Sequence, residues 1–497
     1  MNLRTNGWFA ALVLTLFLLT AAQAPAQERK VQHHHYKLID LGTLGGPNSF
    51  YFSAPVVESV NNKGKVAGAA DTSAPDPSCF VDCNILHAFE WQDGVLTDLG
   101  TLPGGANSMA FWINEHGLIL GGSENGVIDP VFGGPQQIAV VWQDGQITSL
   151  GTLGGGLSFG NAMNNRGEVV GISANAIPDP LSFLGVGTQI RAFLWRDGAM
   201  LDLGTLGGPD SWAAAVNERG QVAGWALVDS TIQHPFLWES GRMIDLGTLG
   251  GTFAVVGSLS NGGSGASLNN RGQVIGTSNL AGDLTHHPFL WDKTVLTDLG
   301  TLGGDSGEAY WINGRGEIVG RADLPGSQIH HAFLWENGKM LDLGAAPGQP
   351  CSTAIDINSR GQIIIDTGIC GVGGGPGLLW EDGNLYDLNS LIPSNSGLAV
   401  GDVNFINDRG EIAATGNFPS GDEHAILLVP CDQDHPGLEG CDYDPVDAST
   451  PSHGLPPVQN HSAAGSGSSQ VVPAEMMTRS RSMTASRNHR FGTWPRQ

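Results

Sequence analysis

Residues 191–208 read RAFLWRDGAMLDLGTLGG, and the features of this stretch return throughout the chain. An apolar phrase ending in Trp (191–195) is followed by Asp-Gly (197–198) and then by DLGTLGG (202–208). Asp-Gly between two apolar runs is typical of a β-hairpin, because both residues accept the positive φ angles of a tight turn. The stretch therefore predicts two antiparallel strands followed by a glycine-rich crossing.

Three phrases recur in fixed order, which makes an internal repeat the main signal of this sequence. DLGTLGG or a variant of it stands at 40–46, 98–105, 149–156, 202–208, 245–251, 298–304, 342–348 and 387–393. An Asn-x-x-Gly turn follows each time, at Asn61, Asn114, Asn164, Asn217, Asn269, Asn313, Asn358 and Asn407. The phrase that closes each unit lies at 87–91, 138–142, 191–195, 234–238, 287–291, 331–335, 377–380 and 424–428.

Each unit holds four short apolar runs, here named strands a to d, separated by Gly, Asn and Asp. Four strands within about 43–58 residues is the size of a propeller blade. The sequence therefore predicts an all-β protein, a β-propeller of eight four-stranded blades. The segment 36–41 reads as a d strand with no blade before it, and the last unit lacks its own d strand. Pairing 36–41 with 425–428 would close the ring and hide its sheet edges. An open β-solenoid is the alternative, although its coils rarely contain such paired hairpin turns.

The phrases HAFEW (87–91) and HAFLW (331–335), repeated in order with DLGTLGG, resemble those of the HAF-repeat family of bacterial extracellular repeat proteins. The resemblance covers residues 36–428. It implies export, and it brings no established activity and no catalytic residues with it.

The two ends of the chain differ from the repeats. Residues 1–26 have a basic start, a 13-residue apolar run (8–20) and small residues before position 27, which is typical of a secretory signal peptide; an uncleaved anchor is the alternative. We expect a short linker at 27–35, the propeller at 36–429, a disulfide-pinned loop at 430–444 and a disordered tail at 445–497. No further apolar segment is long enough to span a membrane, so a secreted or periplasmic protein is expected.

The six cysteines favour an exported protein with disulfide bonds. Their proximity in the sequence predicts the pairs Cys79–Cys83, Cys351–Cys370 and Cys431–Cys441. Zinc is the weaker alternative, because no Cys-x-x-Cys spacing occurs. No cofactor is expected, although the acids around Cys431 and Cys441 leave Ca²⁺ open; their spacing is not that of an EF-hand loop.

The composition limits the partners. Glycine supplies 73 of 497 residues, charged residues only 14 %, and the net charge is −25. Many tight turns and short strands agree with this glycine content, and such acidity opposes binding to nucleic acid or to an anionic membrane surface.

Residues present in every unit are expected to be architectural: the His of the closing phrase holds a strand, the Trp packs between sheets and the Asn opens its turn. The match of residues 156–160 to the G-x-S-x-G motif is discounted, because that motif needs a strand–turn–helix context.

Candidate functional residues are those that break the repeat. Insertions at 70–86, 122–137, 172–190 and 252–266 all fall on connections b–c or d–a, which leave the ring on the same face. Variable loops on a rigid face commonly bind ligands, while neutral drift would produce the same pattern. Acids beside aromatic rings suit sugar or cation recognition. The ligand-binding candidates are Asp71, Asp76, Asp82, Glu124, Asp129, Asp179, Trp112, Trp212, Tyr310 and Trp311.

These observations predict a secreted binding module that uses this face for an extracellular glycan or protein. The alternative is an extracellular carbohydrate-active enzyme, a hydrolase or lyase, using acids of the same face, since glycoside hydrolysis needs two carboxylates at a defined separation. No acid or His stands in a catalytic spacing, so we assign no catalytic residue and favour binding.

Overall fold

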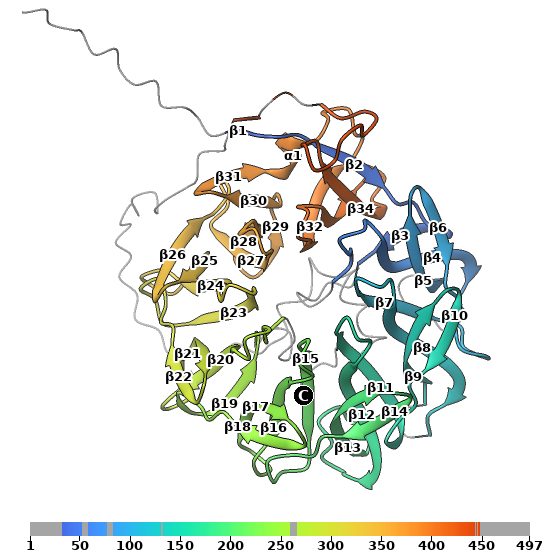
Figure 1. Cartoon of the computed structure of the whole chain (residues 1–497), viewed down its shortest axis with the longest axis vertical. Helices are drawn as coiled ribbons and strands as arrows, with labels where there is room; N and C mark the ends of the chain where they lie inside the picture. The colour runs from blue at the N-terminus through green and yellow to red at the C-terminus, as the bar shows by residue number, and fades with distance from the viewer. Residues whose placement is uncertain are drawn as a thin grey trace, which may run out of the picture.

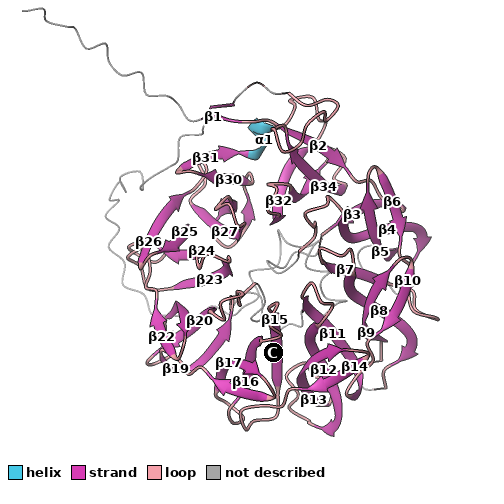
Figure 2. Ribbon diagram, viewed as in Figure 1, coloured by secondary structure: helices cyan, strands magenta, loops and turns pink. Residues whose placement is uncertain are grey.

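The computed structural model describes residues 32–51, 58–76, 83–130, 133–258, 266–442, 444 and 446–447. Almost every regular element in these residues is a β-strand, and the single helix among them, α1 (Leu388–Leu391), is one turn long (Figure 2). The strands form eight blades arranged in a ring, with strand a nearest the centre and strand d at the rim (Figure 1). The predicted β-propeller is confirmed, and the solenoid is excluded.

The blades follow the order of the chain. Blade 1 contains β3 (Gly45–Phe50), β4 (Val66–Pro75), β5 (Asn84–Gln92) and β6 (Val95–Asp98). Blade 2 contains β7 (Ser108–Ile113), β8 (Ile119–Ile128), β9 (Pro135–Gln143) and β10 (Gln146–Ser149). Blade 3 contains β11 (Gly154–Met163), β12 (Val169–Pro178), β13 (Thr188–Arg196) and β14 (Ala199–Asp202). Blade 4 contains β15 (Ser211–Val216), β16 (Val222–Leu227), β17 (Gln233–Glu239) and β18 (Arg242–Asp245).

The second half repeats the pattern. Blade 5 contains β19 (Gly250–Val256), β20 (Val274–Leu280), β21 (His286–Asp292) and β22 (Val295–Asp298). Blade 6 contains β23 (Gly307–Ile312), β24 (Ile318–Asp323), β25 (His330–Glu336) and β26 (Lys339–Gly344). Blade 7 contains β27 (Cys351–Ile357), β28 (Ile363–Ile369), the short β29 (Gly373–Gly374), β30 (Leu378–Glu381) and β31 (Asn384–Asp387). Blade 8 contains β32 (Ala399–Ile406), β33 (Ile412–Asn417) and β34 (Glu423–Pro430).

The fourth strand of blade 8 comes from the other end of the chain. β2 (Tyr36–Asp40) pairs antiparallel with β34, from Tyr36 opposite Pro430 to Asp40 opposite Ile426. This is the ring closure that the unpaired segment 36–41 predicted. Outside it, β1 (Gln32–His33) pairs with β35 (Val446–Asp447). Residues 32–33, expected within the short linker, and residues 446–447, expected within the disordered tail, are therefore paired strands, because each supplies the other's backbone partners.

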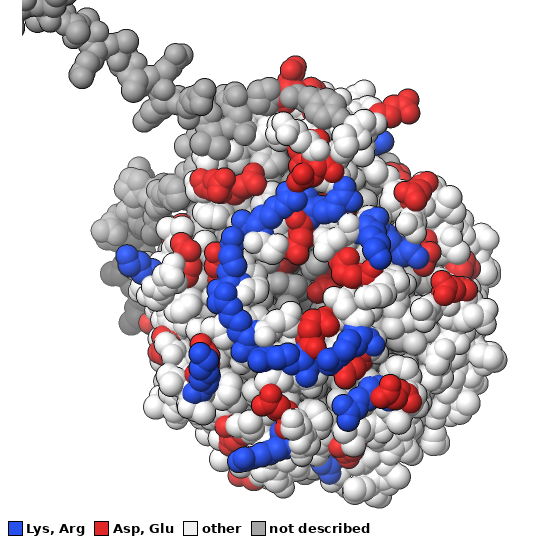
Figure 3. All heavy atoms as spheres, in the orientation of Figure 1, with Lys and Arg blue, Asp and Glu red and all other residues white. Residues whose placement is uncertain are grey.

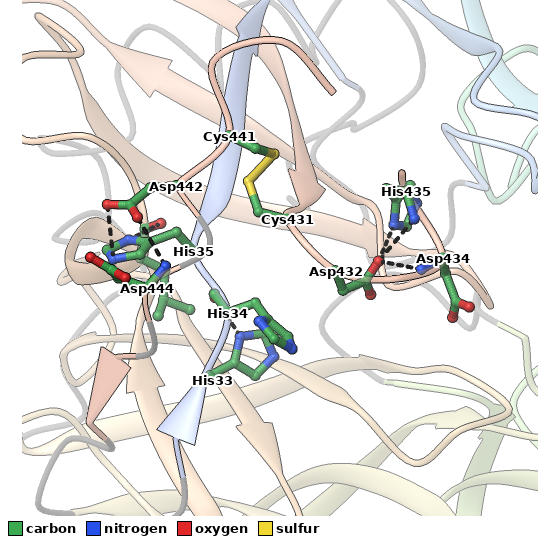
Figure 4. The surroundings of a disulfide bond; sticks show 11 residues. His33, His34, His35, Cys431, Asp432, Asp434, His435, Cys441, Asp442 and Asp444 are labelled. Carbon is green, nitrogen blue, oxygen red and sulfur yellow. Dashed lines mark hydrogen bonds and ion pairs between the residues drawn. A yellow bond between two sulfur atoms is a disulfide. The ribbon is translucent and has the colours of Figure 1, made fainter. Parts of the chain in front are cut away.

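A disulfide bond pins the chain beside this closure. Cys431 and Cys441 are bonded, and the Cys431 backbone N–H donates to the His35 carbonyl at 2.8 Å. Figure 4 shows this bond within the loop that follows β34, beside His33, His34 and His35 of the segment that enters β2. The second predicted pair, Cys351–Cys370, is also confirmed and joins β27 to the end of β28. Cys79 lies outside the described residues, so the pair Cys79–Cys83 stays a prediction.

The apolar residues of the repeat fill the space within and between the blades. The Phe of the closing phrase is fully buried in five blades, and it packs across the strand pair onto the glycine of strand b. At Gly224, a Cβ atom would lie 2.7 Å from Phe236 and 2.0 Å from the Trp212 carbonyl oxygen. Only glycine leaves room for Phe236 and the Trp212 carbonyl at this position. The Phe of the closing phrase and the Gly of strand b therefore recur together because they pack against each other.

The Asn of the a–b turn links each blade to the next. Its Oδ1 accepts two backbone N–H bonds within its own turn, as predicted; at Asn217 the donors are Arg219 (3.0 Å) and Gln221 (3.1 Å). Its Nδ2 donates to the carbonyl of the corresponding Asn in the following blade. The eight bonds are 2.9–3.2 Å long and run from Asn61 through Asn114, Asn164, Asn217, Asn269, Asn313, Asn358 and Asn407 back to Asn61. We call this closed set the asparagine ring.

Candidate functional site

The two faces of the ring differ in construction. The a–b and c–d hairpins, which are short, form what we call the hairpin face, and the b–c and d–a connections form the loop face. The insertions at 70–86, 122–137 and 172–190 largely continue the ladder, because β4, β8 and β12 each have ten residues where β16 and β24 have six. In all three blades the pairing of strands b and c shifts register near the end of strand b, as between Glu124 and Ile128 in blade 2. The insertions of blades 1–3 are thus extended hairpin arms.

The predicted acids of the first two arms are buried and hydrogen-bonded. Asp71 accepts from Asn48 Nδ2 at 2.9 Å, within blade 1. Asp76 accepts from Asn107 Nδ2 at 3.2 Å, and Glu124 accepts from the Asn107 backbone N–H at 3.1 Å. Asn107 therefore ties the arm of blade 1 to blade 2. A buried carboxylate without a hydrogen-bond partner would be costly, so these bonds stabilise the arms. Because the carboxylates are buried, they are not open to a ligand.

The other acids divide between buried and local roles. Asp129 is 7 % exposed, and its carboxylate lies against Gly156 of blade 3. Asp179 is half-buried and accepts from the Leu181 backbone N–H at 2.9 Å, within its own turn. Asp82 lies outside the described residues. The structure therefore does not gather the predicted acids into one open site.

The predicted aromatic residues lie on inner strands. Trp112, Tyr310 and Trp311 are buried, with exposed fractions of 4–7 %, because their strands face neighbouring blades. Trp212 is half-buried and stacks on Trp225, with ring centroids 6.0 Å apart. Phe183, from the arm of blade 3, packs edge-on against Trp225 at 5.2 Å. The aromatic residues therefore fix this arm against blade 4.

The loop face also exposes large apolar side chains. Twelve large apolar side chains are exposed among the described residues, and eight of them stand at b–c connections. The remaining four lie on the outer d strands. The eight are Val127, Ile128, Ile177, Leu181, Phe183, Leu284, Ile369 and Val372. Five of them belong to the adjacent arms of blades 2 and 3, and we call these five the apolar tips. Leu181 is 89 % exposed. Exposed apolar clusters on a water-soluble surface mark interaction sites.

The closing phrase and the DLG phrase share a contact that the sequence reading missed. The His Nδ1 lies 2.8–2.9 Å from a carboxylate oxygen of the DLG Asp, so the His holds strand c to strand d, as expected. The pairs are His87–Asp98, His234–Asp245, His287–Asp298, His331–Asp342 and His424–Asp40. The sequence carried only a weak signal for this pair, because blade 2 lacks both partners, with Ile138 and Ser149 instead, whereas blade 3 lacks the His and keeps Asp202. The hydrogen bond to Asp40 raises the pKa of His424.

Basic side chains gather on the hairpin face. Seven of the eight a–b turns carry Lys or Arg two residues after the Asn, and Figure 3 shows an arc of basic side chains around the centre of this face. The members are Lys63, Arg166, Arg219, Arg271, Arg315, Arg360 and Arg409. Arg271 Nη1 donates to the Arg315 carbonyl at 2.8 Å, and Arg315 pairs with Glu317 at 2.7 Å. These residues bridge neighbouring turns, and acids beside them offset their charge.

A buried carboxyl lies at the inner edge of blade 7. Asp356 is 1 % exposed, and its Oδ2 accepts from the Ile406 backbone N–H of blade 8 at 2.9 Å. Its Oδ1 has no hydrogen-bond partner among the residues that the structure describes. Burial raises the pKa of Asp356 from 3.8 to about 8. Burial and the charge of Asp356 also raise the pKa of Glu58.

This carboxyl predicts a loss of stability at alkaline pH. Asp356 binds its proton more tightly in the folded chain than in the unfolded chain, so folding loses stability as pH rises from about 4 to 8. Asp356→Asn keeps the acceptor for Ile406 and removes the ionisation. We expect the variant to melt several degrees above the wild type at about pH 9 and to lose this advantage near pH 5. The measurement is thermal unfolding across that range.

The control is Asp366→Asn, since Asp366 also accepts from a blade 8 backbone N–H (Val403, 3.0 Å) but is only half-buried. Equal melting temperatures for wild type and Asp356→Asn at every pH would show that folding does not shift the pKa of this carboxyl, and would contradict the prediction.

The described residues were also considered as metal ligands and as membrane-spanning segments. Within the described ranges, no group of three or more His, Cys, Asp or Glu side chains is placed to hold a metal ion. Near Cys431, Asp434 pairs with Arg360 at 2.9 Å and Asp432 with His435 at 2.7 Å. The helix content of the described chain includes nothing of the length and apolar character needed to cross a membrane.

Solved structures similar to this chain are β-propellers. The propeller domain of the trilobed protease from Pyrococcus furiosus matches with a TM-score of 0.39 and 7 % identity, over 72 % of this chain and 96 % of that one. Dipeptidyl peptidase 4 from Porphyromonas gingivalis matches with a TM-score of 0.43 and 10 % identity, over 74 % of this chain and 58 % of that one. A PL25 ulvan lyase matches with a TM-score of 0.34 and 9 % identity, over 80 % of this chain and 96 % of that one. No family model and no curated protein matches the chain. These likenesses concern the fold alone.

Proposed function

We propose that the chain is an exported member of the HAF-repeat group that binds another protein through its loop face and has no chemistry of its own. The apolar tips carry this proposal. Val127, Ile128, Ile177, Leu181 and Phe183 are each at least half exposed to water, on two adjacent arms. Leaving such side chains in water forgoes the free energy of burying them, and a partner that covers them recovers it.

The construction of the arms supports a binding role. Buried acids and the contact of Phe183 with Trp225 hold the arms in one conformation before any partner arrives. A preorganised surface loses little conformational entropy on association. The carbohydrate-active enzyme considered from the sequence would need two accessible carboxylates on this face, and Asp71, Asp76, Glu124 and Asp129 are buried.

The charge of the chain supports a partner of a particular chemistry. The net charge of −25 favours association with basic surfaces and slows the approach of acidic ones. We therefore infer a polypeptide segment with apolar side chains flanked by Lys or Arg. The two disulfide bonds of the described residues are compatible with the extracellular or periplasmic setting that such a module implies.

The test is selection from a displayed library of random dodecapeptides against the full chain. We expect the enriched peptides to combine apolar and basic residues, because the tips are apolar and the chain is acidic. The double variant Leu181→Ser with Ile128→Ser should weaken their binding at least about tenfold, since both side chains stand at exposed ends of the arms.

The matched control is Val295→Ser with Val95→Ser. These positions are 61 % and 64 % exposed but lie on outer d strands away from the arms. Equal loss of binding in both double variants, or enrichment of acidic peptides, would contradict the proposal.

A further inference from the structure

A pocket of about 460 Å³ opens on the hairpin face, between blades 2 and 3. One wall is the c–d hairpin of blade 2, with Gln143, Gln146 and Thr148. The other is formed by Arg166 of the blade 3 turn and by Trp195 at the end of β13, and Leu118 forms part of the apolar lining. This volume falls in the range of small-molecule sites. The pocket faces away from the apolar tips, so it is independent of the protein-binding role proposed above.

The pocket lies where the repeat is broken. In blades 3–8 the residue four after the turn Asn is Glu or Gln, and it accepts from the Asn Nδ2 at 2.6–2.8 Å. In blade 4 this residue, Gln221, also donates to Glu239 at the end of strand c, at 2.9 Å. Blade 2 has Leu118 at this position, and Leu118 can make neither bond. The polar bridge from turn to strand c that blades 4, 5 and 7 make is therefore missing at the pocket.

The polar groups along the pocket are left available. Gln143 and Gln146 are exposed, and neither side chain has a hydrogen-bond partner in the described chain. Their amides can each donate and accept, as can the hydroxyl of Thr148. Arg166 adds donors and Asp144 adds acceptors. Such a mixed set matches hydroxyl groups, which donate and accept at once, and the half-buried indole of Trp195 offers an apolar face beside them.

The charges select a neutral ligand. The guanidinium of Arg166 is already paired with Glu168, and Asp144 adds a negative charge to the lining. The chain as a whole carries −25, so its field opposes an anion. We infer that this pocket is a subsite for one neutral pyranose unit of a glycan, with the sugar face on Trp195 and its hydroxyls on the amides of blade 2. The sequence predicted sugar recognition on the loop face. We propose it for the hairpin face, where an indole and polar side chains are accessible together.

The experiment is calorimetric titration of the full chain with four neutral hexasaccharides, of glucose with α- or β-linkage, of mannose and of xylose, and with hexagalacturonate. We expect at least one neutral oligosaccharide to bind. Leu118→Gln should restore the repeat bridge and replace the apolar lining with an amide bonded to the turn, so it should weaken binding at least about tenfold while the melting temperature stays equal or rises. Absence of binding by every neutral oligosaccharide, or binding of hexagalacturonate alone, would overturn the inference.

Arg166→Gln and Arg315→Gln form a matched pair. Both remove an Arg–Glu pair at the same position of an a–b turn, but only Arg166 lines the pocket. We expect a loss of about tenfold for Arg166→Gln and unchanged binding for Arg315→Gln. Equal losses would assign the sugar to the basic arc as a whole and overturn the pocket; a loss at neither position, with binding retained in Leu118→Gln, would overturn it as well.

Discussion

A chain that lacks residues 1–40 is expected to lose its closed ring and to aggregate or melt far below the intact protein. Removing β2 strips β34 of its outer partner along the whole ladder from Tyr36–Pro430 to Asp40–Ile426. It also uncovers an apolar edge, because Tyr36 packs in the core of blades 7 and 8. The lost backbone bonds and apolar burial amount to a cost on the order of 5 kcal/mol or more. Thermal unfolding and size-exclusion chromatography measure the effect.

The control is a chain that lacks residues 1–34, which loses β1 and its pairing with β35 but keeps β2. It should elute from size-exclusion chromatography as the intact protein does, with a small change in melting temperature. Adding a synthetic peptide of residues 32–42 to the shorter chain should restore stability, since a free edge accepts a matching strand. If the chain without residues 1–40 melts like the control, the ring does not depend on this strand.

Asn217→Ala should be the most damaging single substitution on the hairpin face. The side chain is buried, and its Nδ2 donates to the Asn269 carbonyl (3.1 Å) and to Gln221 (2.7 Å). Its Oδ1 accepts two further backbone bonds, so alanine leaves several buried groups without partners. The expected loss of stability is about 2–4 kcal/mol, measured as a shift in denaturant or thermal unfolding. Asn217→Asp keeps the acceptor and should lose less, which isolates the bond between blades.

Asn165→Ala provides the comparison. Asn165 stands one residue after the ring Asn of blade 3, is exposed and accepts a single backbone bond, from Glu115 at 2.9 Å. Its loss should cost less than about 1 kcal/mol. Equal effects at Asn217 and Asn165 would mean that the asparagine ring adds nothing beyond ordinary turn contacts.

The architecture could be predicted because short sequence motifs, repeated in each unit, determine the turns between its strands. Asn-x-x-Gly and Asp-Gly specify turn geometry wherever they stand, and eight copies in fixed order specify eight blades. The missing d strand of the last unit and the extra one at 36–41 fixed the closure. Two disulfide pairs followed from short separations in the sequence.

The site could not be predicted in the same way, because burial depends on contacts between segments far apart in the chain. Asp76 and Glu124 look like free loop acids until Asn107 of the neighbouring blade is placed between them. Trp112 and Trp311 stand beside crossings in the sequence, yet inner strands turn them toward the core. The pocket at Leu118 was readable as a departure from the repeat, but only the structure places it against Trp195.

The origin of the closing strand sets the order in which the protein can be completed. β2 is synthesised first and its partner β34 last, and the bond between Asp40 and His424 spans 384 residues. Until residue 430 has emerged, blade 8 has no edge to offer, and the N-terminal strand remains unpaired throughout synthesis. Contacts so distant form slowly, and unpaired strands invite association with other chains. The final step of folding is therefore the one most exposed to chaperones and to neighbouring copies.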